Sequence, residues 1–138
     1  MSKLNFDPAA LKAEALRVVG HFMCSEDLSA GGVASALLTE SGSLHTGICI
    51  DTACSLGFCA EHAAIADMLK TRQTRIVAIV AVNAGEEIMP PCGRCRELIR
   101  QVDPGNWATN VIVADDKIVT LAELLPYGEA VKSAPVAR

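Results

Sequence analysis

The residues best suited to chemistry in this sequence are three cysteines and one glutamate, which lie in two short segments. The first segment is Cys59-Ala60-Glu61-His62, and the second is Pro91-Cys92-Gly93-Arg94-Cys95. Cysteine thiolates are ligands of Zn²⁺, and a carboxylate held beside a metal can take up and return protons. The two segments therefore predict a zinc centre with a glutamate at hand.

Glu61 belongs to a predicted helix over 59–71 and lies on its apolar face. Glu61, Ile65, Met68 and Leu69 follow one another at the i, i+4, i+7 and i+8 spacing of one helical stripe. Burying a carboxylate in a core costs free energy unless a positive charge or a hydrogen-bond donor compensates it. Glu61 therefore requires a chemical reason for its position.

The second segment opens another predicted helix, over 93–102. Its inward stripe contains Cys92, Cys95, Leu98, Ile99 and Val102. Helical side chains tilt toward the N-terminus, so residues of a first turn can surround a point just beyond the helix end. We expect the N-termini of both helices to face one ion, with Cys59, Cys92 and Cys95 converging on it.

Three protein ligands leave the fourth tetrahedral position open to water, as in catalytic zinc sites. Three thiolates also overcompensate the charge of Zn²⁺, so positive partners are needed nearby. The helix N-termini supply partial positive charge, and Arg94 or Arg96 could donate hydrogen bonds to the sulfurs from outside the ligand set. These surroundings predict lowered pKa values for the cysteines.

Composition narrows the class of protein and of partner. The 138 residues carry a formal net charge of -4 with one Trp, one Tyr and three Phe, so long nucleic acid is not an expected partner. The longest apolar run is 76–82, far short of the ~20 residues of a membrane span. We expect a single domain over 1–138 with a core of about 25–127.

The N-terminus lacks the features of a secretory signal, which predicts a cytoplasmic location. In that reducing compartment the six cysteines are expected to be ligands, catalytic groups or apolar residues rather than disulfides. Cys24, Cys49 and Cys54 are interpreted as buried apolar residues or pocket lining.

Hydrophobic periodicity and turn residues predict an α/β fold. Helices are expected over 7–22, 59–71, 93–102 and 121–125, and strands over 33–39, 44–50, 75–82, 111–113 and 117–120. The strand over 75–82 is apolar throughout, as a central strand is, and the last two strands are joined too closely to be parallel. The order implies a three-layer α/β/α sandwich with a mixed five-stranded sheet, followed by a weakly ordered tail over 131–138.

The two cysteine segments resemble the C-A-E and P-C-G-x-C motifs of the cytidine deaminase-like zinc deaminases, in particular the small homotetrameric cytidine deaminases. Within that superfamily the chain is most similar to blasticidin-S deaminase. The supporting matches are Ser25-Glu26-Asp27, Asp103-Pro104-Gly105 and Glu123-Leu124-Leu125-Pro126. The resemblance implies a Zn²⁺ cofactor, a homotetramer and hydrolysis of a small aminopyrimidine, such as cytidine, deoxycytidine or blasticidin S, with release of ammonia.

The resemblance also implies a role for individual residues. Cys59, Cys92 and Cys95 would bind zinc, while Glu61 would move a proton from water to the ring nitrogen and then to the leaving amine. Backbone groups at Ala60 and Pro90 would contact the ring. Cys49 and Asp51 would lie where relatives hold the sugar, and Tyr127 would stack on the ring in the pocket of a neighbouring subunit.

Four positions depart from the family pattern. Where cytidine deaminases carry Phe, Asn, Glu and Arg, this sequence has Gly31, Cys49, Asp51 and His62. Cysteine cannot supply both the donor and the acceptor of a carboxamide, so a sugar hydroxyl loses a partner at a cost of about 1 to 3 kcal/mol if it stays buried. Asp51 can accept hydrogen bonds from a sugar or pair with a cationic substituent. The sequence therefore leaves the identity of the aminoheterocycle open.

Three other interpretations fit parts of the pattern. A structural zinc site would need a fourth ligand, for which His45 or His62 is eligible. A redox Cys-x-x-Cys pair at a helix start would need neither the third cysteine nor the buried acid. A catalytically silent, zinc-stabilised interaction module would use the metal only for folding.

Overall fold

The computed structural model describes residues 5–128, and the predicted tail over 131–138 lies outside this range. In chain order the elements are α1 (Pro8–Leu16), β1 (Phe22–Met23), β2 (Leu28–Thr39), β3 (Leu44–Thr52), α2 (Ala60–Lys70), β4 (Ile76–Asn83), α3 (Gly93–Val102), the 3₁₀ helix η1 (Pro104–Ala108), β5 (Asn110–Ala114), β6 (Lys117–Thr120) and α4 (Leu121–Leu124). None of the helices within 5–128 combines the length and hydropathy that a membrane crossing requires.

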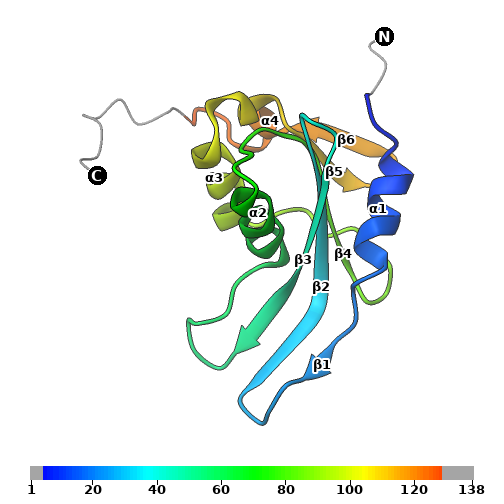
Figure 1. Ribbon diagram of the computed structural model, residues 1–138, viewed down its shortest axis with the longest axis vertical. Coiled ribbons are helices and arrows are strands. Elements are labelled where there is room, and N and C mark those ends of the chain that lie inside the picture. The colour runs from blue at the N-terminus through cyan, green and yellow to red at the C-terminus, as the bar shows by residue number, and fades with distance from the viewer. Residues whose placement is uncertain (1–4, 129–138) are drawn as a thin grey trace, which may run out of the picture.

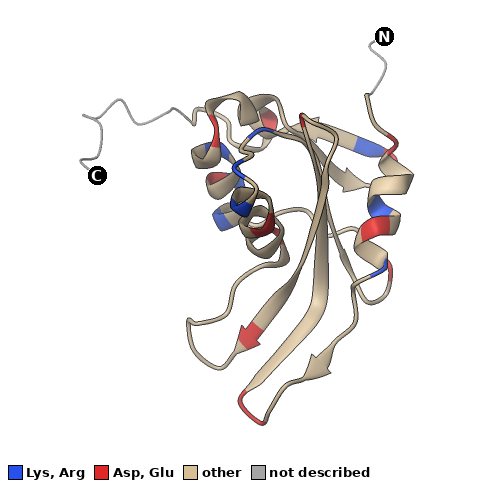
Figure 2. Ribbon diagram, in the orientation of Figure 1, with Lys and Arg blue, Asp and Glu red and all other residues tan. Residues whose placement is uncertain are grey.

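One mixed sheet organises these elements. β2 pairs antiparallel with β3 along one edge and with β4 along the other, β4 pairs parallel with β5, and β5 pairs antiparallel with β6. β4 is therefore central, and the last two strands are antiparallel, as the sequence predicts. In Figure 2 the long central strands are almost free of charged residues, as suits strands covered on both faces.

Helices cover both faces of the sheet, which confirms the predicted three-layer sandwich (Figure 1). On one face α1 buries Leu11 and Ala15 against Val80 and Val82 of β4. The opposite face carries α2, α3 and α4, whose buried side chains pack with the strands in a second core. This core contains Leu37, Ala64, Ile65, Met68, Ile76, Ile79, Ile99, Val111 and Leu121.

The predicted first helix is too long and the predicted sheet has one strand too few. α1 ends at Leu16, and Phe22 and Met23 form β1, which pairs with Ala30 and Ser29. The apolar residues of this segment matched helical spacing, but Gly20 interrupts the helix and its N–H donates to the Gly31 carbonyl at 2.8 Å. The sheet accordingly has six strands rather than five.

β2 also begins earlier than predicted, at Leu28 rather than at position 33. A β-bulge that contains Gly31 and Gly32 allows the strand to continue across these two glycines. The register against β3 shifts between Ala30 and Ala34. Gly31 within the bulge has φ +83°, and a Cβ there would lie 2.1 Å from the Gly20 carbonyl oxygen. Glycine is therefore required at position 31.

Helix α2 presents a slightly different face to the core than predicted. Glu61, Ile65 and Met68 are buried as expected, but Leu69 is 37 % exposed, and Ala64 lies inside instead. The cause is the close approach of α2 to β3 at Gly47, where a Cβ would lie 2.3 Å from the Ala64 backbone nitrogen. This contact fixes the helix that carries Glu61.

A buried asparagine ties α3 to the central strand. Asn106 in η1 is fully buried; its Oδ1 accepts the Ile76 N–H at 2.8 Å, and its Nδ2 donates to the carbonyls of Ile99 at 2.9 Å and Thr74 at 3.1 Å. The sequence predicted only a helix end here.

We expect Asn106→Ala to lower the free energy of unfolding by about 2 to 4 kcal/mol, because it removes the partners of two buried backbone groups and one partly buried one. Urea denaturation measures the change. Gln101→Ala, at an exposed position of α3, serves as the control and should shift stability by less than about 0.5 kcal/mol. Equal stability of the two variants would contradict the role assigned to Asn106.

Candidate metal centre and active site

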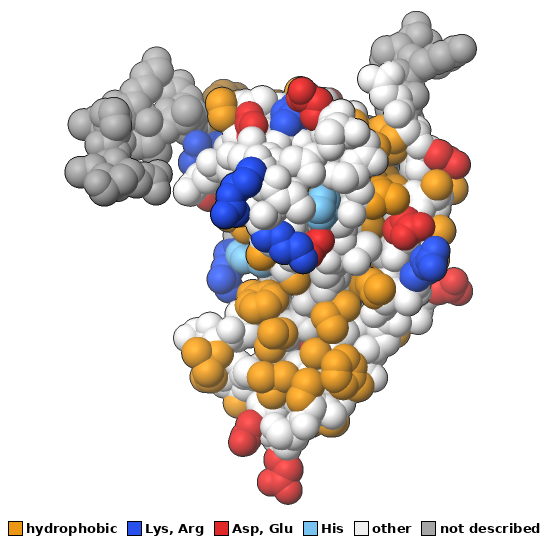
Figure 3. Space-filling model, viewed as in Figure 1, with side chains coloured by type: hydrophobic (Ala, Val, Ile, Leu, Met, Phe, Trp, Pro, Cys, Tyr) orange, Lys and Arg blue, Asp and Glu red, His pale blue; other side chains and the backbone are white. Residues whose placement is uncertain are grey.

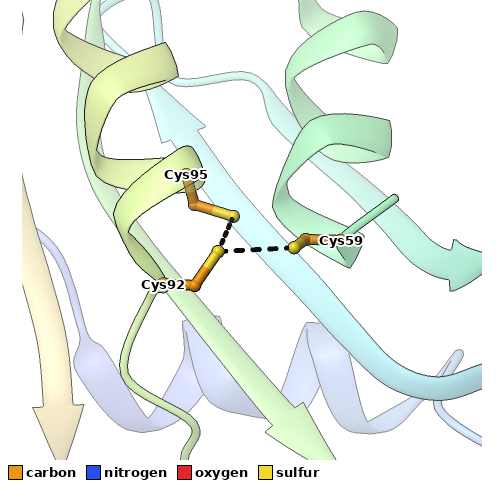
Figure 4. A group of neighbouring side chains, drawn as sticks. All are labelled: Cys59, Cys92 and Cys95. Carbon is orange, nitrogen blue, oxygen red and sulfur yellow. Dashed lines mark hydrogen bonds between the residues drawn. The ribbon is translucent and has the colours of Figure 1, made fainter. Parts of the chain in front are cut away.

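Three sulfur atoms meet between the first turns of two helices. The Cys92 Sγ lies 3.5 Å from the Cys59 Sγ and 3.5 Å from the Cys95 Sγ, and all three atoms lie within 4.8 Å of one another. Figure 4 shows the Cys59 side chain directed from α2 toward those of Cys92 and Cys95 at the start of α3. The predicted convergence is therefore present.

The helix ends explain why anionic sulfur is tolerated here. Cys59 is the N-cap of α2 and Cys92 the N-cap of α3, and both have extended backbone. The first N–H groups of a helix lack intrahelical partners and carry partial positive charge. Both N-termini therefore favour negative charge at the same point.

The prediction of lowered cysteine pKa values holds only at Cys92. Burial raises the pKa of Cys92, but the Cys95 backbone N–H and the neighbouring thiols lower it by more, so it falls below its ordinary value. Burial, followed by the thiol of Cys92, raises the pKa of Cys59. At Cys95 burial raises the pKa strongly, and the charge of Glu61 adds to it.

Glu61 completes this concentration of acidic groups. Its side chain is only 5 % exposed, burial raises its pKa, and it lies close enough to Cys95 for the two charges to repel. The spacing of Glu61 with the apolar residues of α2 predicted the burial of Glu61 correctly. Each thiolate or carboxylate formed here makes ionisation of the neighbouring acidic groups less favourable. A divalent cation bound among the sulfurs would favour the ionised forms instead.

The donor set fits zinc with an open position. Within residues 5–128, Cys59, Cys92 and Cys95 are the one group of three or more metal-binding side chains close enough to share an ion. His45 does not join them, because its Nδ1 bonds Asp67 Oδ2 at 2.7 Å and its Nε2 lies 3.1 Å from Ser43 Oγ. His62 lies on α2 but outside the group. The structural site with a histidine ligand is therefore disfavoured.

A cavity of about 580 Å³ opens beside the sulfurs, within the usual size range of small-molecule sites. Glu61, Cys59 and Cys92 line it. So do five further residues that the sequence predicted for the site, namely Cys49, Asp51, Ala60, Pro90 and Arg94.

Sequence reasoning missed several wall residues. Thr52, Phe58 and Met89 line the cavity, and so does Ser55, which had no predicted role beyond shaping its loop. The available signal was their position, because they flank Asp51, Cys59 and Pro90. Their types alone indicate no chemistry.

Three predicted residues make no side-chain hydrogen bond to the sulfurs within the described residues. Tyr127 is fully exposed and does not line this cavity. Arg94 lines the cavity, but its side chain forms no hydrogen bond to the sulfurs within the described residues. Arg96 instead donates to the carbonyls of Pro91 at 2.9 Å and Leu124 at 3.3 Å, so it braces the start of α3.

The remaining cysteines and His62 occupy different surroundings. Cys49 is buried and lines the cavity, whereas Cys54 is exposed at the cavity wall. The interpretation of Cys24 as buried or pocket lining is wrong, since it is exposed near β1 and outside the cavity. His62 Nε2 is buried and has no hydrogen-bond partner among residues 5–128, and burial together with Arg94 lowers the pKa of His62.

Curated proteins similar to this chain are cytidine deaminases. The chain is 32 % identical over 97 residues to a cytidine deaminase of Halalkalibacterium halodurans, with 68 % of this chain and 74 % of that protein covered. It is 34 % identical over 100 residues to a cytidine deaminase of Sporosarcina psychrophila, with 68 % and 71 % covered. No family model matches the chain.

Solved structures of cytidine deaminases share the fold of this chain. The cytidine deaminase of Mycobacterium leprae superposes with a TM-score of 0.73 at 26 % identity, covering 88 % of this chain and 99 % of that one. That of Mycobacterium tuberculosis gives a TM-score of 0.77 at 24 % identity over 92 % and 100 % of the two chains, which supports the fold. The sequence matches, the shared fold and a cysteine triad consistent with that family's zinc site together show that this chain belongs to the cytidine deaminase family.

Proposed function

We propose that this protein is a zinc-dependent hydrolase that deaminates cytidine-type nucleosides and releases ammonia. The observation that carries the proposal is a buried carboxylate, Glu61, beside three convergent sulfurs at the wall of one cavity. The whole chain is proposed to work as one deaminase domain. Membership of the cytidine deaminase family supports the same reaction class.

Cys59, Cys92 and Cys95 are the proposed zinc ligands. When bound, zinc supplies a Lewis acid that makes water a nucleophile near neutral pH. The N-termini of α2 and α3 offset part of the thiolate charge. Arg94, which faces the same cavity, adds positive charge without being a ligand.

Glu61 is the proposed proton carrier. It accepts one proton from the attacking water and delivers it to the ring nitrogen. It then takes the second proton from the hydroxyl added to the ring carbon and gives it to the leaving amine, so it ends each cycle unprotonated. Its burial keeps bulk water from competing for these protons. Backbone groups at Ala60 and Pro90, both at the cavity wall, are proposed to contact the ring.

Asp51 at the cavity wall is the proposed binding residue for the rest of the substrate, and Cys49 lies beside it. Cytidine and deoxycytidine are the first candidates because of the relatives' activity. Blasticidin S or another aminoheterocycle is the second candidate, favoured by Gly31 and Cys49, which leave less aromatic and carboxamide surface than relatives offer. A catalytically silent module is disfavoured, since a buried carboxylate would then cost stability without a role.

A homotetramer is proposed on two observations. β1 and the adjoining ends of β2 and β3 project beyond the helices, and Figure 3 shows apolar side chains gathered over that lower half of the face. Phe22 at 50 %, Met23 at 58 % and Leu56 at 78 % are exposed large apolar residues of this region. Such patches mark contact surfaces, and the exposed Tyr127 is then free to stack on substrate in a neighbouring subunit.

A cytoplasmic location is also proposed. Its support is the free state of all six cysteines, three of which are needed as thiolates for the metal.

The purified protein should contain one zinc ion per chain, measured by plasma mass spectrometry. Cys92→Ser should lower zinc affinity by more than about 100-fold, because serine is a poor zinc ligand and even indirect partners of a metal cost about 10- to 100-fold. Cys24→Ser removes an exposed cysteine outside the cavity and should retain full zinc. Full occupancy in both variants would rule out the triad.

Glu61→Gln should retain zinc and the fold but lower kcat for cytidine by about 10²- to 10⁴-fold, the usual contribution of a general acid–base residue. Ammonia release measures the loss. The matched control is Glu87→Gln in an exposed turn, which should leave kcat unchanged. Native turnover in the Glu61 variant would remove this residue from the mechanism.

Light scattering of the native protein should give four times the 14.5 kDa mass of one chain. Leu56→Asp places a charge on the exposed apolar region and should reduce the mass, whereas Ala9→Asp, on the exposed first turn of α1, should not. A monomeric native protein would contradict the proposed assembly.

A further inference from the structure

Cys49 occupies an unusual place in the sheet, opposite the bulge of β2. Ala30 pairs with Ile50 and Ala34 with Ile48, so Cys49 alone faces the three residues 31–33. The bulge interrupts the backbone ladder here, and the Cys49 Sγ accepts the Val33 N–H at 3.3 Å. The sulfur thus provides a partner for a backbone donor that the bulge leaves without its usual one.

The same sulfur also makes a second contact, toward the cavity. Cys49 and Asp51 are two residues apart on β3 and share one face of the strand, and the Cys49 thiol donates to Asp51 Oδ2 at 3.4 Å. Burial raises the pKa of Cys49, so the thiol keeps the proton that it donates. Both hydrogen-bonding capacities of this weakly polar group are therefore in use.

Asp51 can accept a further hydrogen bond besides the one from Cys49. Its side chain is exposed at the cavity wall, and an ionised carboxylate is an acceptor only, with two oxygens. One oxygen is engaged by Cys49, which leaves the other for a ligand. A donor group on the ligand, such as a sugar hydroxyl, is the complement of that acceptor.

We propose that Cys49 is a positioning residue that contacts no substrate and instead holds Asp51 so that one carboxylate oxygen accepts a hydrogen bond from a sugar hydroxyl. The inference rests on the proposed nucleoside deaminase function and deepens it. It concerns the role of Cys49 alone, because sugar binding by a carboxylate at position 51 is what the family resemblance already implies. It also replaces the earlier expectation that Cys49 binds substrate directly.

Steady-state kinetics with cytidine and free cytosine test this assignment. Cys49→Ala should raise KM for cytidine about five- to tenfold with kcat within about twofold, the size of one hydrogen bond lost from substrate binding. KM for cytosine, which has no sugar, should not change. Cys49→Ser keeps a donor and an acceptor and should restore KM to within about twofold of native, while Cys24→Ala is the control for loss of a cysteine elsewhere.

A double-mutant cycle separates positioning from a general effect on the fold. In an Asp51→Ala background, Cys49→Ala should have no further effect on KM, and zinc content should remain one per chain in every variant. A KM increase that persists without Asp51, or that appears equally with cytosine, would overturn the proposal.

Calorimetric titration of cytidine into Glu61→Gln variants measures binding without turnover. Adding Cys49→Ala should raise Kd by the same five- to tenfold, and only while Asp51 is present. Coupled binding in a protein whose native form releases no ammonia would refute the proposed function and leave this inference intact. Absence of nucleoside binding, or binding without this coupling, would refute the inference itself.

Discussion

The site depends on one electrostatic constraint, which is that three sulfurs and a carboxylate are packed where each negative charge opposes the others. The fold meets this constraint by placing the N-termini of two helices at the same point. The N-termini of α2 and α3 bring first-turn N–H groups to Cys59 and Cys92, while the pKa of the more deeply buried Cys95 remains raised. Cation binding at the sulfurs is therefore coupled to release of protons from the cysteines.

Positioning these two helices is the task of the sheet beneath them. Gly47 of β3 allows α2 to approach at backbone distance, and Asn106 of η1 joins α3 to the start of β4. Neither residue lines the cavity, yet each holds one of the two helices that carry the cysteines against the sheet. Tight packing of this kind transmits small changes in volume to the metal ligands.

The sequence predicted most of this arrangement because its strongest signals were local and periodic. Glu61 on the apolar stripe of α2, and the paired cysteines at the start of α3, predicted the burial and the convergence that the structure shows. The errors lie where tertiary contacts override local pattern. Phe22 matched helical spacing but pairs with β2, and Leu69 matched the inward stripe but is displaced by the approach of α2 to β3 at Gly47. The cavity residues Phe58 and Met89 were missed, because their role comes from their position beside Cys59 and Pro90 rather than from chemical type.

The bulge in β2 also limits how the pocket can change over evolution. Gly31 packs so closely against the Gly20 carbonyl that no side chain can be accommodated at its position in this backbone. A single substitution at Gly31 therefore cannot add an aromatic side chain at this point of β2. A larger residue there would first require remodelling of the segment between α1 and β1, which carries Gly20, so this position of β2 is confined to glycine until that segment changes.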